Sequence, residues 1–485
     1  MVRYFGTNGV RGTFDVLDPM LAMRLAASVG VYFNRGTILV ARDARLTGEC
    51  LEHAVFAGLQ SVGCQPVSLG IVSSPTAEFM VKKLSADGLI IITASHNPPE
   101  WNALKVVDKN GVTISWERGE EIERIMESKN RTESGTTSVT SANWDSVKDV
   151  RVYPSAEDEH IAEIKKSVDQ KLINPKSIPP KLVQKQTKKF KVVLDCGNGT
   201  AATIAPRLFR ELGCDVTILN GTVDGRFPGR PSEPREENIQ ELLRLVPKLG
   251  ADIGIAWDGD GDRVVCVDEK GGFVVGDRVF ALCALSELRN QKGNGAIATT
   301  VATSKAVEEV AARFGCKTIY TKIGAPYLSE AVAMGGAGGS TMPDAVVMAG
   351  EEVGGVIWPK FSLAKDGFLT AAKIIEFMCE KGKSLSELLK DVPLYFNEKE
   401  KIPCTAEQKE KIVSGMRKYV RDNKLIGVLI DGVRINFEDG FGSWVICRAS
   451  GTENYVRVFA ESKDKIKARK LVEEYKGIAN KYMSE

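Results

Sequence analysis

Three aspartates at alternating positions are the strongest chemical signal in the sequence. Asp258, Asp260 and Asp262 form the run D-G-D-G-D-R directly after the apolar segment 252–256. Carboxylates that converge at about 4 Å repel by roughly 4 kcal/mol per pair at an effective dielectric constant of 20, so they require a cation. Oxygen ligands favour Mg²⁺ or Ca²⁺ over softer metals. An EF-hand is disfavoured because Arg263 stands where its loop needs glycine. The alternative without a ligand is a polar turn between two strands.

A serine in the run T-A-S-H-N-P at 93–98 is the second signal. It follows the apolar segment 88–92, and we expect Ser95 at a strand-to-helix loop, where backbone N–H groups can hold a phosphate. A serine hydrolase is disfavoured because there is no G-x-S-x-G elbow and His96 is adjacent to the serine. The remaining interpretations are a helix N-cap and a serine that itself carries phosphate. Lys105 lies downstream in a polar cluster that a cap does not require.

Two further loops carry polar groups suited to a phosphorylated sugar. The run R-A-S-G-T-E-N at 448–454, with Arg457 beyond it, offers two guanidinium groups, two hydroxyls and a glycine, which can grip a phosphate ester. The alternative is a charged turn between strands. The run G-E-E-V-G-G at 350–355 is weaker, because an acidic pair on a glycine loop either binds sugar hydroxyls or faces solvent.

Composition excludes several classes of protein. The 485 residues predict three or four domains, and 65 basic against 63 acidic residues give a net charge of +2. That balance argues against nucleic-acid and membrane-surface partners, which require a basic excess. No apolar run approaches a membrane span of about 18 residues, and the first residues lack the apolar core of a signal peptide. Ten scattered cysteines without a C-x-x-C pair predict buried thiols in a cytoplasmic protein.

The elements that position these loops follow a repeated pattern. Short apolar runs lead into polar loops and then into amphipathic spacing, which predicts α/β domains with mostly parallel sheets covered on both faces. Ligands bind at the carboxyl ends of such strands. From about residue 395 the pattern becomes α+β and ends in a helix with an apolar stripe. The runs that we expect to be strands are 37–41, 88–92, 191–194, 252–256, 296–298, 426–430, 433–437, 444–448 and 456–460.

Taken together, the five motifs at 5–12, 93–98, 258–263, 350–355 and 448–454 occur in an order that resembles the α-D-phosphohexomutase family, which includes phosphomannomutase/phosphoglucomutase and phosphoglucosamine mutase. The resemblance implies three related mixed α/β sandwich domains plus a C-terminal α+β domain around a central active-site cleft. The domains would span 1–155 with the phosphoserine loop, 156–272 with the metal-binding loop, 273–394 with the sugar-binding loop and 395–485 with the phosphate-binding loop.

The resemblance also implies a role for each candidate residue. Ser95 would be the phosphoserine and would hold Mg²⁺ together with Asp258, Asp260 and Asp262. Catalytic roles would fall to Lys105 in proton transfer, Arg11 in assisting it, His96 in hydrogen bonding and Arg263 in neutralising charge. The substrate would be bound by Glu351 and Val353 in the sugar loop and by Arg448, Ser450, Gly451, Thr452 and Arg457 around the non-reacting phosphate.

The implied activity is interconversion of hexose 6-phosphate and hexose 1-phosphate through a phosphoserine enzyme. A hexose 1,6-bisphosphate would be both intermediate and activator, and small phosphosugars would be the ligands of a monomer or homodimer. We favour glucosamine phosphate because Glu352 could face a 2-ammonium group. Val353 and Gly355 replace the hydroxyl and imidazole that the family often has there, so mannose and glucose phosphates remain the alternative. A catalytically silent sugar-phosphate or calcium-binding protein is the distant alternative.

Overall fold

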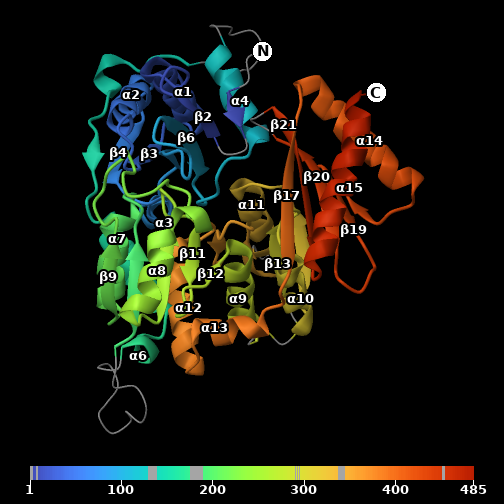
Figure 1. Ribbon diagram of the computed structural model, residues 1–485. Helices are drawn as coiled ribbons and strands as arrows, with labels where there is room; N and C mark the ends of the chain where they lie inside the picture. Colours follow the sequence, from blue (N-terminus) through green and yellow to red (C-terminus); the bar gives the residue numbers. More distant parts are fainter. Residues whose placement is uncertain are drawn as a thin grey trace. The chain divides into compact units, whose positions relative to one another are not determined.

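The computed structural model describes residues 4–6, 9–128, 139–174, 189–289, 291, 293, 295–336, 345–450 and 454–484. The chain forms two compact units. Unit 1 comprises Met1–Val279 and Val353–Leu389, and unit 2 comprises Phe280–Glu352 and Lys390–Glu485. Figure 1 shows the helices and strands of the chain, coloured along the sequence.

The first sheet of unit 1 has the strand order β1-β2-β6-β5-β3-β4-β7. Strands β5, β3, β4 and β7 are parallel, whereas β6, β2 and β1 continue the sheet in antiparallel pairing. The strands are β1 (Phe5–Gly6), β2 (Gly9–Thr13), β3 (Thr37–Arg42), β4 (Gln65–Ile71), β5 (Gly88–Ile92), β6 (Trp101–Asp108) and β7 (Arg151–Val152).

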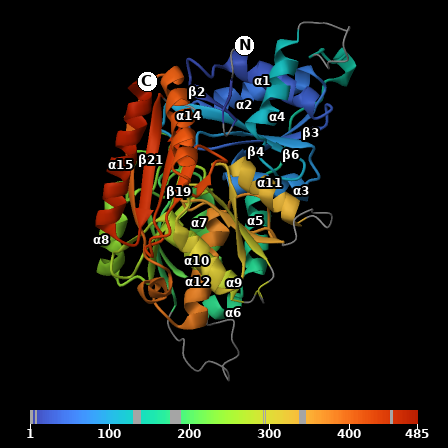
Figure 2. The ribbon, with the colours of Figure 1, turned by 90° about the vertical axis from the view of Figure 1, so that its right-hand side faces the viewer.

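Alternating side chains give this sheet two buried faces. On β5, Ile90 and Ile92 pack with one set of helices, while Leu89 and Ile91 pack with the other. One face is covered by α1 (Pro19–Tyr32), α2 (Gly48–Ser61) and α4 (Trp116–Glu127), and the other by α3 (Ser74–Lys83) and the start of α5 (Ala156–Ser167). Figure 2 shows α1, α2 and α4 together on their side of the sheet.

The second sheet of unit 1 has the order β12-β11-β10-β8-β9. Parallel strands β9 (Asp215–Leu219), β8 (Lys191–Asp195) and β10 (Ile253–Trp257) are followed by antiparallel β11 (Val264–Val267) and β12 (Phe273–Val274). The helices of this part of the unit are α6 (Gln170–Ile173), α7 (Ala201–Glu211), α8 (Gln240–Leu249) and the start of α9 (Gly276–Leu288). The segment 353–389 adds β16 (Val356–Ile357), α12 (Gly367–Lys381) and α13 (Leu385–Leu388).

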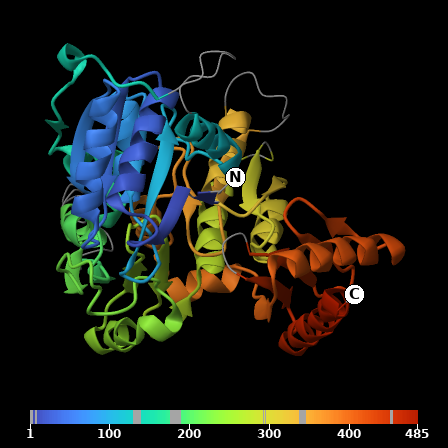
Figure 3. The same ribbon diagram turned by 90° about the horizontal axis from the view of Figure 1, so that it is seen from above.

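Unit 2 contains a parallel part and an antiparallel part. Strand β13 (Ala296–Thr300) pairs in parallel with β14 (Lys317–Thr321) and β15 (Val346–Gly350), accompanied by α10 (Lys305–Arg313) and α11 (Ala325–Gly336). The C-terminal antiparallel sheet has the order β17-β21-β20-β19-β18, and α14 and α15 lie side by side against it (Figure 3). Its elements are β17 (Phe396–Pro403), α14 (Ala406–Asp422), β18 (Gly427–Val428), β19 (Val433–Asn436), β20 (Trp444–Ala449), β21 (Tyr455–Ser462) and α15 (Lys465–Ser484).

The expected strands are present, with some differences. A strand, β6, follows the Ser95 loop instead of a helix, because 101–108 is rich in apolar and β-branched residues that extend the sheet. Strand β17 was not expected, because its exposed charged residues hide the strand pattern. Most cysteines are buried, but Cys50 is exposed. No described helix combines the length and apolar character that a membrane crossing requires. The four domain boundaries stay a prediction.

Candidate active site

Ser95 lies in the turn between β5 and β6 and is almost fully buried. Its φ angle of 51° lies in the left-handed region, which is strained for a residue other than glycine and is typical of functional sites. The hydroxyl Oγ donates to Asp258 Oδ2 at 2.7 Å. This contact brings together the two motifs that the sequence singled out, although 163 residues separate them.

The three aspartates lie in the turn between β10 and the antiparallel strand β11. All three are buried, and one carboxylate oxygen from each lies within 4.8 Å of the others. Among the described residues, Asp260 Oδ1 and Asp262 Oδ1 are buried and have no hydrogen-bond partner. A buried polar atom without a partner is costly, and a hard cation would satisfy both atoms with its preferred oxygen ligands. The residues present therefore fit Mg²⁺.

Two buried lysines neutralise the same loop. Lys105 Nζ on β6 lies 2.7 Å from Asp260 Oδ2, and Lys365 Nζ lies 3.0 Å from Asp262 Oδ2. Burial alone would lower the pKa of Lys105, but Asp260 and Asp262 outweigh it and raise that pKa. Burial would raise the pKa of Asp260, but Lys105 holds it below its ordinary value. Burial, and then the other two carboxylates, raise the pKa of Asp258.

Three further predicted residues lie around Ser95. Arg11 on β2 donates to Asn97 Oδ1 at 2.7 Å, and Arg263 donates its backbone N–H to Asp258 at 3.2 Å. His96 Nδ1 lies 3.4 Å from Ser95 Oγ. Repulsion from Arg263, followed by burial and by Arg11, lowers the pKa of His96 far below its ordinary value. The imidazole is therefore neutral and can accept or donate a hydrogen bond without adding charge. Burial, followed by Arg263, lowers the pKa of Arg11 to about 10.

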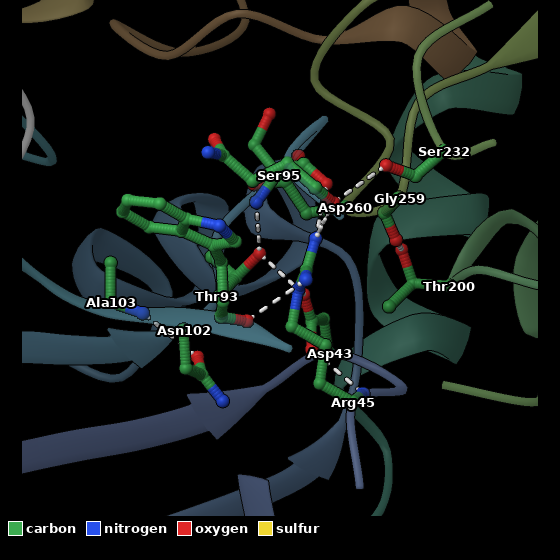
Figure 4. Close-up of polar contacts among 12 residues, drawn as sticks. Asp43, Arg45, Thr93, Ser95, Asn102, Ala103, Thr200, Ser232, Gly259 and Asp260 are labelled. Atoms are coloured by element: carbon green, nitrogen blue, oxygen red, sulfur yellow. Dashed lines mark hydrogen bonds and ion pairs between the residues drawn. The ribbon is translucent and has the colours of Figure 1, made fainter. Parts of the chain in front are cut away.

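A fully buried arginine outside every motif holds the serine loop. Arg45 donates to the backbone carbonyls of four loop residues, and its Nε pairs with Asp43 at 3.0 Å (Figure 4 labels Arg45, Asp43 and Ser95). Asp43 also accepts from the Thr93 hydroxyl at 2.7 Å, and that hydroxyl accepts from the backbone N–H of Ser95. One side chain thus fixes the path of the whole loop. The four carbonyls belong to Ser95, Asn97, Pro98 and Trp101.

The second sheet's loops also contact the serine loop. Ser232 Oγ donates to Asn97 O at 3.0 Å, and the ring of Phe227 lies 5.1 Å from the Arg45 guanidinium (Figure 4 labels Ser232 and Arg45). Gly259 approaches so closely that a Cβ there would lie 2.6 Å from Ser95 O. A cavity of about 710 Å³ borders His96 and the segment 226–238, a volume within the usual range of small-molecule sites.

In the sugar-loop motif, the structure places Glu351 and Glu352 directly after β15 of unit 2. Glu351 is buried, and Glu352 Oε2 accepts from the Thr300 hydroxyl at 3.1 Å. Val353 is half-buried in the turn that follows and begins the second segment of unit 1.

The predicted phosphate loop follows β20 in unit 2. Arg448 Nε pairs with Asp431 Oδ2 at 2.9 Å, and Arg457 donates to the Tyr455 hydroxyl at 2.7 Å. The two arginines are opposite each other on neighbouring strands β20 and β21. Ser450 is buried. The other predicted contacts, Gly451 and Thr452, lie outside the described residues.

Sequence reasoning missed two residues that the structure brings to this site. Arg45 follows the apolar segment 37–41 by four positions, so the D-A-R triplet after a strand was the available signal. Lys365 has no neighbouring motif except the acidic and glycine residues that begin α12. An isolated lysine gives no local sign of a partner 103 positions away, and its pairing with Asp262 depends on tertiary packing.

Family models of the phosphoglucomutase/phosphomannomutase type match four successive parts of the chain. The α/β/α domains I, II and III match residues 2–133, 160–272 and 275–395, and the C-terminal domain matches 401–477.

Relatives match nearly the full length. A phosphoglucomutase/phosphomannomutase of Thermococcus kodakarensis is 36% identical, covering 98% of this chain and 97% of its own. A phosphoglucosamine mutase of Methanococcus vannielii is 37% identical, covering 97% of both. Among solved structures, a phosphoglucomutase/phosphomannomutase family protein from Burkholderia thailandensis has a TM-score of 0.81 at 23% identity, covering 99% of this chain and 97% of its own.

Proposed function

This chain belongs to the phosphoglucomutase/phosphomannomutase family of phosphohexomutases, and we propose that it interconverts glucosamine 6-phosphate and glucosamine 1-phosphate. The observation that carries the proposed chemistry is the contact of the strained, buried Ser95 hydroxyl with the aspartate loop at 2.7 Å. A serine in this position is oriented for covalent chemistry by its surroundings.

Two phosphoryl transfers account for the reaction. In the first, the O–P bond of phosphorylated Ser95 breaks as an O–P bond forms on the free sugar hydroxyl. That hydroxyl loses its proton, and the released Ser95 Oγ takes up one. In the second, Ser95 Oγ loses its proton as it forms a bond to the other phosphoryl group of the bisphosphate. The O–P bond to the sugar breaks, and that sugar oxygen takes up a proton. We assign Lys105 to proton transfer, assisted by Arg11, and the neutral His96 to hydrogen bonding at Oγ. Arg263 and, when bound, Mg²⁺ on Ser95 and the three aspartates would supply positive charge to the transferring group.

The non-reacting phosphate is assigned to the loop of Arg448, Ser450 and Arg457, with Gly451 and Thr452. Guanidinium groups suit a phosphate because they bind its oxygens in a bidentate manner. A bisphosphate that turns around presents either phosphate to this loop, so the loop must bind phosphate without reading the rest of the sugar.

The choice of glucosamine phosphate depends on the sugar loop. Glu351 would bind sugar hydroxyls, and Val353 would line the same loop. Glu352, held by Thr300, adds a second carboxylate that could face a 2-ammonium group. Several relatives with about 35% identity carry the name phosphoglucosamine mutase, which supports this choice. Mannose and glucose phosphates are the second candidate, supported by the Thermococcus relative. The thiols, free of disulfides among the described residues, suit a cytoplasmic enzyme.

The deciding experiment compares kcat/KM for glucosamine 6-phosphate and mannose 6-phosphate, with Mg²⁺ and a trace of bisphosphate. We expect a preference for the amino sugar of about 100-fold, which corresponds to about 2.7 kcal/mol in the transition state. Equal values would replace the proposal with a generalist mutase. Glu352→Gln should reduce amino-sugar turnover more than mannose turnover, and equal losses would exclude Glu352 as the discriminating group. If neither sugar is turned over and Ser95 takes no phosphate from a sugar bisphosphate, the catalytically silent alternative holds.

A further inference from the structure

His160 is a fully buried histidine on α5 that the proposed reaction does not use. Its Nδ1 lies 2.8 Å from Thr76 Oγ1, and its Nε2 lies 2.8 Å from Asp366 Oδ2. The carboxylate can only accept, so Nε2 donates to it, and in the neutral ring Nδ1 accepts from the Thr76 hydroxyl. Both ring nitrogens are therefore committed to residues on two different elements, α3 and the segment that begins α12.

The first of these elements holds Asp260. At the start of α3, the Ser74 hydroxyl donates to Asp260 Oδ2 at 2.7 Å. The backbone N–H of Ser74 donates to Asp260 O at 2.9 Å. Thr76 lies half a turn further along the same helix, so its hydrogen bond to His160 fixes the helix end that holds Asp260.

The second element holds Asp262. Lys365, the neighbour of Asp366, pairs with Asp262 Oδ2 at 3.0 Å. Gly367 donates its backbone N–H to Gly261 O at 3.3 Å. Asp366 itself accepts from the first backbone N–H groups of α12. The position of Lys365 therefore depends on the position of Asp366, which His160 holds through the second carboxylate oxygen.

Aromatic rings fix the imidazole between the two elements. Phe79 stacks on His160 at 5.4 Å with an interplanar angle of 25°, and Phe361 and Phe368 flank the ring. Phe368 also reaches the aspartate loop, because a Cβ on Gly261 would lie 2.6 Å from its ring. The imidazole cannot tilt without disturbing a packed cluster.

We propose that His160 is a positioning residue. By hydrogen bonding to both α3 and the segment that begins α12, it fixes the spacing of Asp260 and Asp262, which these elements hold. The inference rests on the proposed function, because its consequence is a preorganised divalent-cation site. Outer hydrogen-bond partners orient metal ligands in this way, and their loss typically weakens metal binding 10- to 100-fold.

The test measures Mn²⁺ binding by titration calorimetry and electron paramagnetic resonance on the full-length protein. His160→Phe keeps the aromatic packing and removes both hydrogen bonds, and we expect about tenfold weaker Mn²⁺ binding. Of the two hydrogen bonds of His160, Thr76→Val removes only the one to Nδ1, in a side chain of nearly equal volume, and should weaken Mn²⁺ binding less. Ile164→Val, a buried substitution on the same helix outside these hydrogen bonds, is the control for general destabilisation and should bind Mn²⁺ as wild type does.

A second readout separates positioning from a merely structural role. At saturating Mn²⁺, His160→Phe should recover most of the wild-type kcat, because the variant is impaired in holding the cation. Binding of Mn²⁺ by His160→Phe within twofold of wild type overturns the inference alone. A wild-type protein that binds no Mn²⁺ and has no mutase activity overturns the proposed function, and this inference with it.

Discussion

The loop that carries Ser95 and the loop that carries Arg448 differ in how far solvent reaches them. In the serine loop and its surroundings, Ser95 and Lys105 are each 3% exposed and Asp260 is fully buried. In the phosphate loop, the side chain of Arg448 is 16% exposed and that of its partner Asp431 is 19% exposed. A charge that water reaches can adapt to different anions, whereas a buried charge must find its partners in the protein.

The two loops also differ in how they are held. The serine loop is fixed by Arg45 through four carbonyls, and Ser95 is kept at a φ of 51°. The phosphate-loop arginine is held by an ion pair with one carboxylate, which an incoming phosphate could displace. Reacting atoms benefit from fixed surroundings, because fixed charges need no reorganisation during the reaction. A loop that is proposed to bind either phosphate of a bisphosphate benefits from side chains that can change position. The comparison predicts losses in kcat for the serine loop and increases in KM for the phosphate loop.

Ser95→Ala should have the largest effect, because it removes the proposed carrier of the phosphoryl group. We expect kcat to fall by about 10⁴-fold or more. A coupled mutase assay measures the rate, and intact-protein mass spectrometry measures phosphate after incubation with a sugar bisphosphate. Ser232→Ala removes a hydroxyl that contacts the same loop and is the matched control, with an expected loss within about tenfold. Substantial turnover by Ser95→Ala would refute the phosphoserine assignment.

Arg45→Lys should have the next largest effect. Lysine keeps the charge, but its single ammonium group cannot reach four carbonyls spread along the loop. We expect kcat to fall by about 100-fold with little change in KM, because the loss concerns the orientation of Ser95. Steady-state kinetics and thermal unfolding measure the two quantities.

Arg42→Lys is the control for Arg45→Lys. Arg42 ends β3, three positions before Arg45, and its side chain pairs with Glu52 at 2.9 Å. We expect its kinetics to stay close to wild type. If Arg45→Lys instead raised KM and left kcat unchanged, the serine loop would not depend on Arg45 for the orientation of Ser95.

Arg448→Gln should give a smaller effect of the opposite kind. Removing one guanidinium from the phosphate loop should raise KM by about tenfold and change kcat by less. The effect should shrink at high salt, because salt screens the partly exposed charge of Arg448. Asp431→Asn frees Arg448 from its ion pair and should lower KM by a small factor. A tenfold loss of kcat in Arg448→Gln would show that the loop acts on the reacting phosphate as well.

Much of the candidate site could be predicted because its residues occur in compact runs. The D-G-D-G-D-R run and the T-A-S-H-N-P run each lie at the end of an apolar strand, and the structure brings both together with Lys105. The short apolar runs also predicted at least one strand in every sheet, since a strand buried on both faces is a continuous apolar segment in the sequence. Runs of this kind carry their signal locally.

The residues that could not be predicted are isolated in the sequence, and their partners lie far away along the chain. Arg45, Lys365 and His160 have no motif, and their roles depend on carbonyls and carboxylates brought in by other elements. Strand β6 was expected as a helix because the loop was compared with strand-to-helix turns. Strand β17 is stabilised by its pairing with β21 more than by its own pattern. Tertiary contacts decide all of these cases.

Glu78 on α3 offers the smallest test, on stability rather than rate. Burial, only partly offset by Lys105, raises the pKa of this carboxyl to about 8. The folded protein therefore binds the proton more tightly than the unfolded chain. The stability that Glu78 contributes is fully present below the unfolded pKa of about 4.5, and it is lost progressively as pH rises from there to the folded pKa of about 8. Glu78→Gln stays neutral at every pH. Between pH 7 and pH 8 the free energy of unfolding of the wild type should fall by about 1 kcal/mol relative to that of the variant. Urea unfolding midpoints measure this difference. Below about pH 3.5, where this carboxyl is protonated in both the folded and the unfolded chain, the difference should be constant, which is the internal control. If the difference in unfolding free energy were constant from pH 5 to pH 8, this carboxyl would already be charged in the folded protein. The buried surroundings of Lys105 would then tolerate a charge, and the contrast with the more exposed phosphate loop would be weaker than we infer.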